Sequence, residues 1–262
     1  MIVIIVQARM GSTRLPGKVM MPIRTRPLLY YIINQIKHCK LVDNIVIATT
    51  VSDQDNQLVK YIESLGTNVF RGNEEDVLDR YYHCAKQYNA DKIVRVTSDC
   101  PLIDPEIIDE CILEFEKNDL DYLSNVNKKI GKQWVYHPSG YPSGFAAEIF
   151  SFSALEKAWK LSKKLSEREH VSQFILNNPN KFKIGNIENH EDFSHIRLTV
   201  DHQIDFDLIK IVIEHFPEGE IFKMKNIIDF LNQNKKLMQL NAHISFNEGY
   251  LKSLEHDKNT NK

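Results

Sequence analysis

The sequence predicts an α/β protein built on a mostly parallel β-sheet with helices on both faces. Short apolar runs of strand length alternate with longer segments whose apolar residues recur at helical spacing. The chain has 262 residues, of which 42% are hydrophobic, so it can bury a full core. Strands that alternate with helices favour right-handed crossovers. These crossovers place every strand-to-helix loop along one edge of the sheet, where we expect a ligand to bind.

The first half of the chain predicts four strands and the helices between them. Residues 2–6 form an unbroken apolar run, which is typical of a buried strand. Gly66 can end a helix in the left-handed conformation, and Pro105 suits the first position of another helix. In order, we expect a strand at 2–7, a helix at 28–40, a strand at 44–49, a helix at 55–65, a strand at 68–70, a helix from about Glu75, a strand at 91–97 and a helix from Pro105.

Residues 120–150 interrupt this alternation. Aromatic residues, Asn, Gly and Pro are interleaved there, which predicts extended segments and turns. We expect an inserted flap or an antiparallel extension. Further along, the pattern predicts helices at 153–162 and 167–176, a strand at 182–187, an extended run at 196–200, and helices at about 204–216 and 224–232.

We therefore expect one domain over residues 1–241, with the flap at 120–150 inserted in it. Residues 242–262 form a tail with weak periodicity. The last seven residues are charged or polar, and we expect them to be disordered.

Composition and charge exclude several classes of protein. The net charge is only −2 and Lys and Arg are spread along the chain, so nothing indicates a nucleic-acid or membrane-binding face. No apolar stretch approaches the ~20 residues that span a bilayer. The apolar run at 2–6 lacks the length and the basic start of a signal peptide, so we expect a cytoplasmic protein. The four cysteines show no paired C-x-x-C spacing, which favours core thiols over zinc or disulfides.

A cationic loop follows the first strand and reads Gln7-Ala8-Arg9-Met10-Gly11-Ser12-Thr13-Arg14-Leu15-Pro16-Gly17-Lys18. Unpaired backbone N–H groups and the side chains of Arg9, Arg14 and Lys18 can together cradle a polyphosphate. The loop is neither a Walker motif nor a dinucleotide fingerprint, because the spacing of its Gly and Lys residues fits neither. The alternative is a solvated surface loop with incidental charge.

Two aspartates follow extended segments. Asp99 stands just past the strand that ends at Thr97, and Asp201 follows the run at 196–200. A carboxylate at such a strand end faces the same crevice as the cationic loop and can hold Mg²⁺ against a triphosphate. The alternative for each aspartate is a helix N-cap or a turn residue.

Several motifs together resemble the cytidylyltransferases that activate acidic sugars, of the spore coat polysaccharide biosynthesis protein F type, with the CMP-Kdo and CMP-sialate synthetases as more distant relatives. The resemblance covers residues 1 to about 215. It rests on the cationic loop and on Ala48-Thr49-Thr50, Gly72-Asn73-Glu74-Glu75-Asp76-Val77-Leu78-Asp79-Arg80, Arg95-Val96-Thr97-Ser98-Asp99-Cys100-Pro101-Leu102-Ile103-Asp104, Arg168-Glu169-His170-Val171 and Arg197-Leu198-Thr199-Val200-Asp201.

The resemblance implies a Rossmann-like, GT-A-like fold of the nucleotide-diphospho-sugar transferases. It implies transfer of CMP from CTP to an acidic sugar or related acceptor, with release of pyrophosphate, in surface polysaccharide or glycan biosynthesis. Mg²⁺ would be held by Asp99 and Asp201. Arg14, Lys18 and Asp99 would be the catalytic residues. The nucleotide would bind to Gln7, Ala8, Arg9, Gly11, Ser12, Thr13, Arg14, Lys18, Arg80, Thr97 and Ser98.

Base recognition is expected at the helix that opens near Glu75 and at the Thr97-Ser98 turn. Arg80 and Ser98 can donate hydrogen bonds to acceptor atoms on the rim of a pyrimidine. The alternative is that Asp79 and Arg80 form surface pairs along their helix.

Acceptor recognition is expected in the second half of the chain. Tyr141-Pro142-Ser143-Gly144-Phe145-Ala146-Ala147-Glu148 resembles the family pattern Tyr-Pro-x-Gly-Leu-Asp-x-Glu, but Ala146 replaces the family Asp and Phe145 the Leu. Arg168 can bind a carboxylate or phosphonate bidentately, although residues 167–170 also suit a solvated first helical turn. The expected acceptor-binding residues are Tyr141, Glu148, Arg168, Glu169, His170 and Arg197.

Other functions stay open. CMP transfer to a phosphonate acceptor needs the same residues. A nucleotide-sugar glycosyltransferase normally carries a D-x-D metal motif, whereas this chain has Ser98-Asp99-Cys100 at that place. A non-catalytic nucleotide-binding protein would need the cationic loop but not both aspartates. The sequence also leaves open whether the protein is a homodimer.

Overall fold

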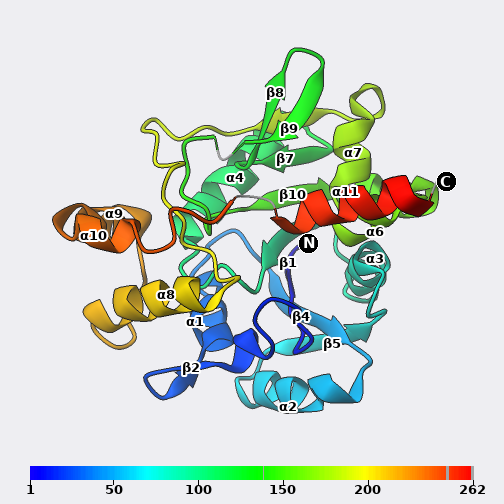
Figure 1. The fold of residues 1–262 in the computed structure, drawn as a ribbon. Coiled ribbons are helices and arrows are strands. Elements are labelled where there is room, and N and C mark those ends of the chain that lie inside the picture. The colour runs from blue at the N-terminus through cyan, green and yellow to red at the C-terminus, as the bar shows by residue number, and fades with distance from the viewer. Residues whose placement is uncertain (138, 246–247, 261–262) are drawn as a thin grey trace.

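A seven-stranded sheet organises residues 1–137, 139–245 and 248–260, which are the residues that the computed structural model describes (Figure 1). The strand order is β11-β7-β10-β6-β1-β4-β5. Parallel pairing joins β6 to β1, β1 to β4 and β4 to β5, whereas β10 runs antiparallel to β6 and β7. The sheet is therefore mostly parallel, as predicted. Its strands are β1 (Ile2–Gln7), β4 (Asn44–Thr50), β5 (Asn68–Gly72), β6 (Lys92–Thr97), β7 (Tyr122–Ser124), β10 (Glu148–Ser151) and β11 (Ile184–Asn186).

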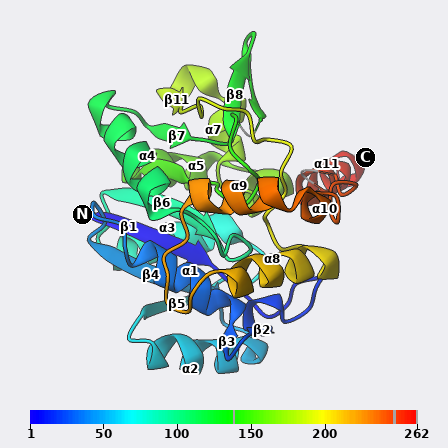
Figure 2. The same cartoon turned by 90° about the vertical axis from the view of Figure 1, so that its left-hand side faces the viewer.

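Helices cover both faces of this sheet, because alternate residues of each strand point to opposite faces. On β1, Ile4 and Val6 pack into one core cluster, while Val3 and Ile5 pack into the other. The first cluster includes residues of α1 (Leu28–Ile36), α2 (Asn56–Ser64), α4 (Pro105–Lys117), α8 (Gln203–His215) and α9 (Met224–Gln233). The second includes residues of α3 (Val77–Gln87), α5 (Phe152–Leu161) and α7 (Gln173–Asn177). Figure 2 looks onto the side that carries α1, α8 and α9.

The smaller elements connect these layers. They comprise the hairpin of β2 (Pro22–Ile23) and β3 (Arg26–Pro27), the helices α6 (Leu165–Glu169) and α10 (Lys235–Met238), and 3₁₀ turns at Lys18–Met20, Asp53–Asp55 and Pro179–Lys181. Among the described residues, no helix combines the length and the apolar character that a bilayer span requires.

The expected flap is narrower than residues 120–150. Its outer parts are β7 and β10, which belong to the main sheet. Only β8 (Asn127–Ile130) and β9 (Gln133–Tyr136) leave the sheet, as an antiparallel hairpin that projects at the top of Figure 1. Pro138 lies outside the described residues.

One sequence prediction about a helix is wrong. The helix expected at 167–176 is split into α6 and α7, because Val171 adopts a φ of 51°, which no right-handed helix accommodates. Disorder is expected for the last seven residues, but α11 (Glu248–Thr260) continues through most of them, and residues 261–262 lie outside the described part. Ser166 explains the order in part, because its N and Oγ donate to Asp257.

Candidate active site

The cationic loop after β1 is held by a buried carboxylate. Asp55 is 1% exposed and accepts hydrogen bonds from the Met10 N–H (2.7 Å) and from the hydroxyls of Thr49 (2.9 Å) and Thr50 (2.5 Å). Burial alone would raise the pKa of Asp55, but the hydrogen bonds from Thr50, Met10 and Thr49 hold that pKa below its ordinary value. Sequence reasoning missed Asp55, although two hydroxyl residues at a strand end shortly before an acid are a usable signal.

Lys18 extends from this loop into the interior rather than into solvent. Its Nζ donates to the Val200 carbonyl at 2.6 Å and to Asp201 Oδ1 at 3.1 Å, and it lies 3.6 Å from Asp99 Oδ2. The residue is only 8% exposed, so a solvated loop does not describe this position. Arg14 also reaches Asp201, with Nη2 2.5 Å from Oδ1.

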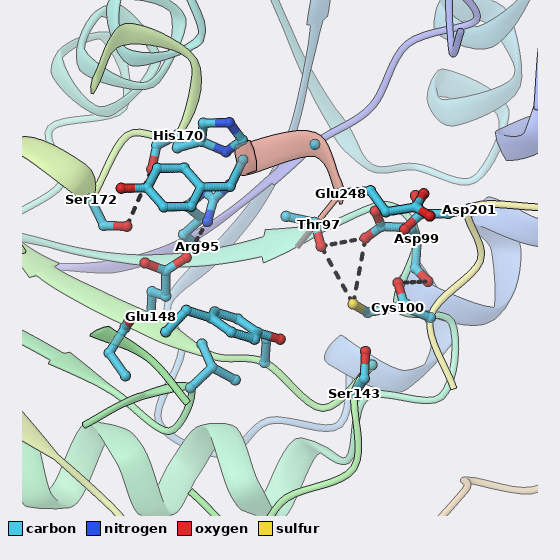
Figure 3. Close-up of a pocket in the computed structure, with 18 of the residues that line it drawn as sticks. Arg95, Thr97, Asp99, Cys100, Ser143, Glu148, His170, Ser172, Asp201 and Glu248 are labelled. Atoms are coloured by element: carbon cyan, nitrogen blue, oxygen red, sulfur yellow. Dashed lines mark hydrogen bonds and ion pairs between the residues drawn. The ribbon is translucent and has the colours of Figure 1, made fainter. Parts of the chain in front are cut away.

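The backbone brings the two aspartates together although about a hundred residues separate them. The Val200 N–H donates to the Asp99 carbonyl at 2.8 Å, and the Thr199 hydroxyl donates to the same oxygen at 3.3 Å. This pairing sets Asp99 and Asp201 side by side, with Lys18 as their shared counterion. Figure 3 shows the two side chains at one end of the site.

Arg197 fixes the orientation of Asp201. Its Nη2 donates to Asp201 Oδ2 at 3.2 Å, while Nε and Nη2 form a two-point contact with the buried Asp205, at 2.9 and 3.0 Å. Asp205 also accepts from the N–H groups of Asp201 and His202 at the start of α8, each at 3.0 Å. Arg197, which the sequence predicts to bind the acceptor, therefore holds a carboxylate in place.

Cations surround the Asp201 carboxylate. Burial would raise its pKa, but Lys18 and Arg14, by charge and by hydrogen bonds, bring the pKa well below the ordinary value. Asp201 is thus ionised throughout the neutral pH range. On Asp99, Oδ1 accepts from the Thr97 hydroxyl and lies 3.5 Å from Cys100 Sγ. Burial beside Asp99 raises the pKa of the Cys100 thiol, which keeps it neutral.

A polar cavity of about 240 Å³ extends from these aspartates. Asp99, Asp201 and Glu248 lie at one end, and Arg95, Glu148 and His170 lie at the other (Figure 3). The rest of the lining includes the neutral polar side chains of Thr97, Asn127, Tyr136, Ser143, Ser172, Gln173 and Thr199, the apolar Val126 and Ala146, and the charged Arg197.

The far end of the cavity rests on a buried ion pair. Arg95 Nη1 pairs with Glu148, and Arg95 Nη2 donates to Gln7 Oε1 at 3.2 Å. The other Glu148 oxygen accepts from the Tyr122 hydroxyl at 2.6 Å. Within the described part of the chain, Arg95 Nε has no hydrogen-bond partner. Sequence reasoning did not select Arg95, although an arginine inside an otherwise apolar strand is an informative signal.

His170 joins this end of the cavity to the C-terminal helix. Its Nε2 lies 2.9 Å from Ser253 Oγ on α11, and its ring meets the Tyr250 ring edge-on at 5.3 Å between centroids. Burial lowers the pKa of His170 below 6.5, more than the Glu169 charge raises it. The imidazole is therefore neutral at pH 7.

Three predicted acceptor residues are not among the described residues that line the cavity. Tyr141 is 3% exposed and packs in the core. Arg168 forms an ion pair with Asp76 at 2.5 Å, which links α6 to the start of α3. Glu169 accepts from Ser253 on α11 at 2.5 Å. Glu148, His170 and Arg197 do line it.

Arg80 does not match its expected contact with the base either. It is 2% exposed, and its Nη1 donates to the Asn73 carbonyl at 2.6 Å. Burial lowers the pKa of Arg80. Through Nη1 the residue orders the turn between β5 and α3, while its buried Nε has no hydrogen-bond partner among the described residues.

The other predicted nucleotide residues lie along the same edge of the sheet. Gln7 ends β1, Ala8 is buried, and Thr97 lines the cavity. Ser98 follows β6 and is 9% exposed. In the loop, Arg9 Nη1 donates to the Glu74 carbonyl at 3.3 Å, Ser12 N donates to Met10 O at 2.9 Å, and Gly11 and Thr13 lie on either side of Ser12.

The carboxylates of Asp99 and Asp201 suit a hard divalent cation. Both already face one cation, Lys18 Nζ, and oxygen ligands are what Mg²⁺ prefers. Among the described residues, no group of three or more His, Cys, Asp or Glu side chains is placed to hold a metal. The pair therefore fits Mg²⁺ that also takes substrate phosphate oxygens and water as ligands, the usual arrangement for this ion.

Comparison with known proteins relates most of the chain to one family. The family model for cytidylyltransferases matches residues 3–249. An uncharacterized protein from Methanocaldococcus jannaschii is 40% identical over 92% of this chain and 94% of its own length. Spore coat polysaccharide biosynthesis protein SpsF from Bacillus subtilis is 32% identical over 89% of this chain and 95% of its own length. The structure of a cytidylyltransferase from Leptospira borgpetersenii superposes with a TM-score of 0.83 at 34% identity, over 91% of this chain and 96% of that one.

Proposed function

The chain belongs to the cytidylyltransferase family, and on that basis we propose that it transfers CMP from CTP to a small acidic sugar or related acceptor and releases pyrophosphate. The observation that carries the proposal is the meeting of three features at one edge of the sheet. Lys18 of the cationic loop contacts both Asp99 and Asp201, and these two aspartates line one end of the cavity. The name of the Bacillus subtilis relative supports a role in polysaccharide biosynthesis.

In the proposed reaction, an acceptor oxygen attacks the α-phosphorus of CTP in line with the departing pyrophosphate. Negative charge accumulates on the phosphate oxygens in the transition state. Arg14 and Lys18 supply positive charge fixed in position before the reaction, the form in which electrostatic stabilisation is largest. Their carboxylate partner, Asp201, is suited to a metal ion, so a magnesium triphosphate would satisfy both the cations and the carboxylate.

Asp99 and Asp201 would hold the Mg²⁺, which would neutralise part of the triphosphate charge. The surrounding residues set the carboxylate positions. Thr97 donates to Asp99, and Arg197, held in turn by Asp205, donates to Asp201. These contacts keep the two carboxylates in place before substrate arrives, so little reorganisation is needed.

The cavity beyond the aspartates provides the acceptor site. Its volume, about 240 Å³, suits a single small molecule, and its lining combines polar and apolar surface with an ion pair at the far end. Ala146 lines this cavity where the related pattern has an Asp, which leaves one carboxylate fewer to face the acceptor. An attacking anomeric hydroxyl releases its proton to solvent as the O–P bond forms, and an ionised phosphonate oxygen carries none, so little general-base chemistry is required of the protein.

A substrate screen tests the proposal. The protein is mixed with Mg²⁺, with each of CTP, ATP, GTP and UTP, and with a panel of sugar acids, phosphonates and neutral sugars. We expect pyrophosphate release only with CTP plus an acceptor, together with a product whose mass is that of CMP joined to the acceptor.

Each other outcome identifies a different function. Release with a phosphonate alone would replace the acidic sugar as acceptor. Sugar transfer from a nucleotide sugar, supplied in place of the triphosphate, would indicate a glycosyltransferase. Binding of triphosphate without any pyrophosphate, across the whole panel, would refute the enzymatic proposal.

A further inference from the structure

The C-terminal helix α11 forms part of the cavity wall. Glu248, Gly249 and Tyr250, its first three residues, line the cavity. Figure 3 shows the start of this helix beside Asp99 and Asp201, with Glu248 next to them. α11 therefore borders the same space as the aspartate pair, although it lies at the far end of the sequence.

Polar contacts hold α11 in this position. Ser253 is 5% exposed and its hydroxyl donates to Glu169 Oε2 at 2.5 Å, while His170 Nε2 lies 2.9 Å from the same hydroxyl. Glu248 Oε2 lies 2.9 Å from His202 Nε2, at the start of α8. The helix is thus attached at two places that flank the cavity.

The family match ends at Gly249, the second residue of α11. The loop, Asp99, Asp201, Arg197 and His170 all lie inside the matched range. The part of the wall that Tyr250 contributes lies outside it. The nucleotide end of the site therefore lies wholly inside the matched range, whereas Tyr250 lies just beyond it.

The charges of the lining indicate which part of an acceptor α11 would face. Of the described lining residues, the two arginines are already paired: Arg95 with Glu148, and Arg197 with Asp205. His170 is held neutral by burial. A negative group placed at this end would lie beside Glu148, whose charge Arg95 already balances, so the pair has no excess positive charge to attract it. Hydroxyl or acylamino groups, in contrast, match the neutral polar lining.

We propose that α11 completes the acceptor site around the uncharged, hydroxyl-bearing end of the acceptor, and that Tyr250 is the residue through which it sets acceptor specificity. The proposal rests on the proposed cytidylyl transfer. It assigns the reacting oxygen of the acceptor to the end of the cavity at Asp99 and Asp201, where the triphosphate would bind. It assigns the remainder of the acceptor to the space between Tyr250, His170 and Glu148.

The first test separates the two substrates kinetically. Tyr250→Ala is compared with Leu251→Ala, a neighbour on the same helix whose side chain is 54% exposed. With CTP and the acceptor turned over best in the substrate screen, Tyr250→Ala should raise the acceptor KM about tenfold and leave the CTP KM within about twofold. Leu251→Ala should change neither. An unchanged acceptor KM in Tyr250→Ala, or an equal rise in both KM values, would overturn the assignment of Tyr250.

The second test needs no acceptor and determines whether α11 covers one side of the cavity. Cys100 lines the cavity and is 3% exposed, whereas Cys84 and Cys111 lie fully buried in the core. Ser253→Arg inserts bulk and charge between α11 and α6, and Leu251→Arg makes the same change on the exposed face. Iodoacetamide should alkylate Cys100 about tenfold faster in Ser253→Arg than in Leu251→Arg, with Cys84 and Cys111 protected in both.

The outcomes distinguish this inference from the proposed function. Equal Cys100 rates in the two arginine variants would refute α11 as a wall of the cavity, whatever the enzyme transfers. If Cys84 and Cys111 also react, Ser253→Arg has unfolded the chain. Cys100 alkylation is then compared between Tyr250→Ala and Leu251→Ala. Equal rates in these two variants would contradict α11 as a wall of the cavity. If the wild-type protein turns over none of the panel but the variants show the expected alkylation rates, the proposed function is contradicted. The assignment of α11 as a wall of the cavity is then still supported.

Discussion

Lys18 is the residue on which the two carboxylates of the candidate site converge. Its ammonium contacts Asp99, Asp201 and the Val200 carbonyl. Lys18→Ala should weaken CTP binding in the presence of Mg²⁺ by ~1.5–3 kcal/mol, which is about 10- to 100-fold in affinity, because a charge-assisted contact to phosphate is lost. Isothermal titration calorimetry measures the change.

The matched control for this substitution is Lys60→Ala, because Lys60 is an exposed lysine on α2. Lys18 is buried beside two carboxylates, so Lys18→Ala should also lower the thermal stability of the ligand-free protein. A folded Lys18→Ala variant that binds CTP as tightly as Lys60→Ala would contradict the role of the loop.

Asp201 is the more constrained of the two aspartates. Arg14, Lys18 and Arg197 all contact its carboxylate. Asp201→Asn keeps the shape but removes the charge that would bind Mg²⁺, so pyrophosphate release should fall by about a hundredfold or more. Asp207→Asn, an exposed position on the same stretch of chain, serves as the control. Full Mg²⁺-dependent turnover in Asp201→Asn would rule out the metal assignment.

His170 gives the fold a pH dependence of predictable sign. Burial lowers its pKa from the ordinary value of 6.5, so the unfolded chain binds the proton more readily than the folded one. The free energy of unfolding should then decrease as the pH falls from about 7 through the lowered pKa of the folded state. Urea unfolding at pH 7.5 and 5.5 measures this decrease.

His170→Gln should reduce that decrease in stability between the two pH values, whereas His243→Gln, at an exposed histidine, should leave it as in the wild type. Equal pH dependence in all three proteins would show that His170 does not carry the effect.

At the scale of elements, one close backbone contact builds the site. The segment at Ser143 pairs with Arg197, and Gly144 beside it has a φ of 104°. A Cβ at Gly144 would lie 2.4 Å from the Leu198 carbonyl oxygen. Only glycine can therefore bring this segment against the chain that carries Arg197 and Asp201.

Gly144→Ala should destabilise the protein by more than about 2 kcal/mol, because backbone strain and a backbone clash act together. Gly131→Ala is the matched control, since Gly131 also has positive φ, but a Cβ added there would meet no atom within 4 Å. We expect the control to cost only about 1 kcal/mol. Chemical denaturation compares them, and equal losses would mean that the clash at Gly144 is relieved without cost.

Elements with strong periodicity could be predicted from the sequence, and elements defined by tertiary contacts could not. β1 is a nearly continuous apolar run, β4 and β6 are mostly apolar in their interiors, and α2 has a clear apolar stripe. The break between α6 and α7 depends on the positive φ of Val171, a β-branched residue that carries no sequence signal for it. α11 is polar on most of its surface and is ordered by partners on α6, which periodicity does not reveal.

The same distinction applies to the site. The loop and the two aspartates were predictable because they follow strands, and parallel strands end at a common edge. Arg168 reads as a free arginine in the sequence, but its partner Asp76 lies 92 positions away, and no local pattern signals such a pair. Arg80 and Tyr141 are likewise buried, and the packing that buries them cannot be recognised from the sequence.

At the scale of the whole molecule, the site joins segments from both ends of the chain. Arg14 and Lys18 come from the first loop, Asp99 from the middle, and Asp201 from the start of α8. A ligand that bridges these groups binds only the folded chain, so its binding free energy adds to the stability of the whole fold.

Thermal melting therefore tests the nucleotide preference directly. At about 100 times its dissociation constant, CTP with Mg²⁺ should raise the free energy of unfolding by about 2.7 kcal/mol. For a chain of this size, each 1 kcal/mol shifts the melting temperature by roughly 2–4 °C, so a shift of several degrees is expected. ATP, GTP and UTP at the same concentration should give smaller shifts, because they share the triphosphate but not the cytosine edge. If CTP stabilises the protein no more than ATP, GTP and UTP do, the protein binds these nucleotides through the triphosphate alone. The assignment of cytosine as the preferred base is then wrong.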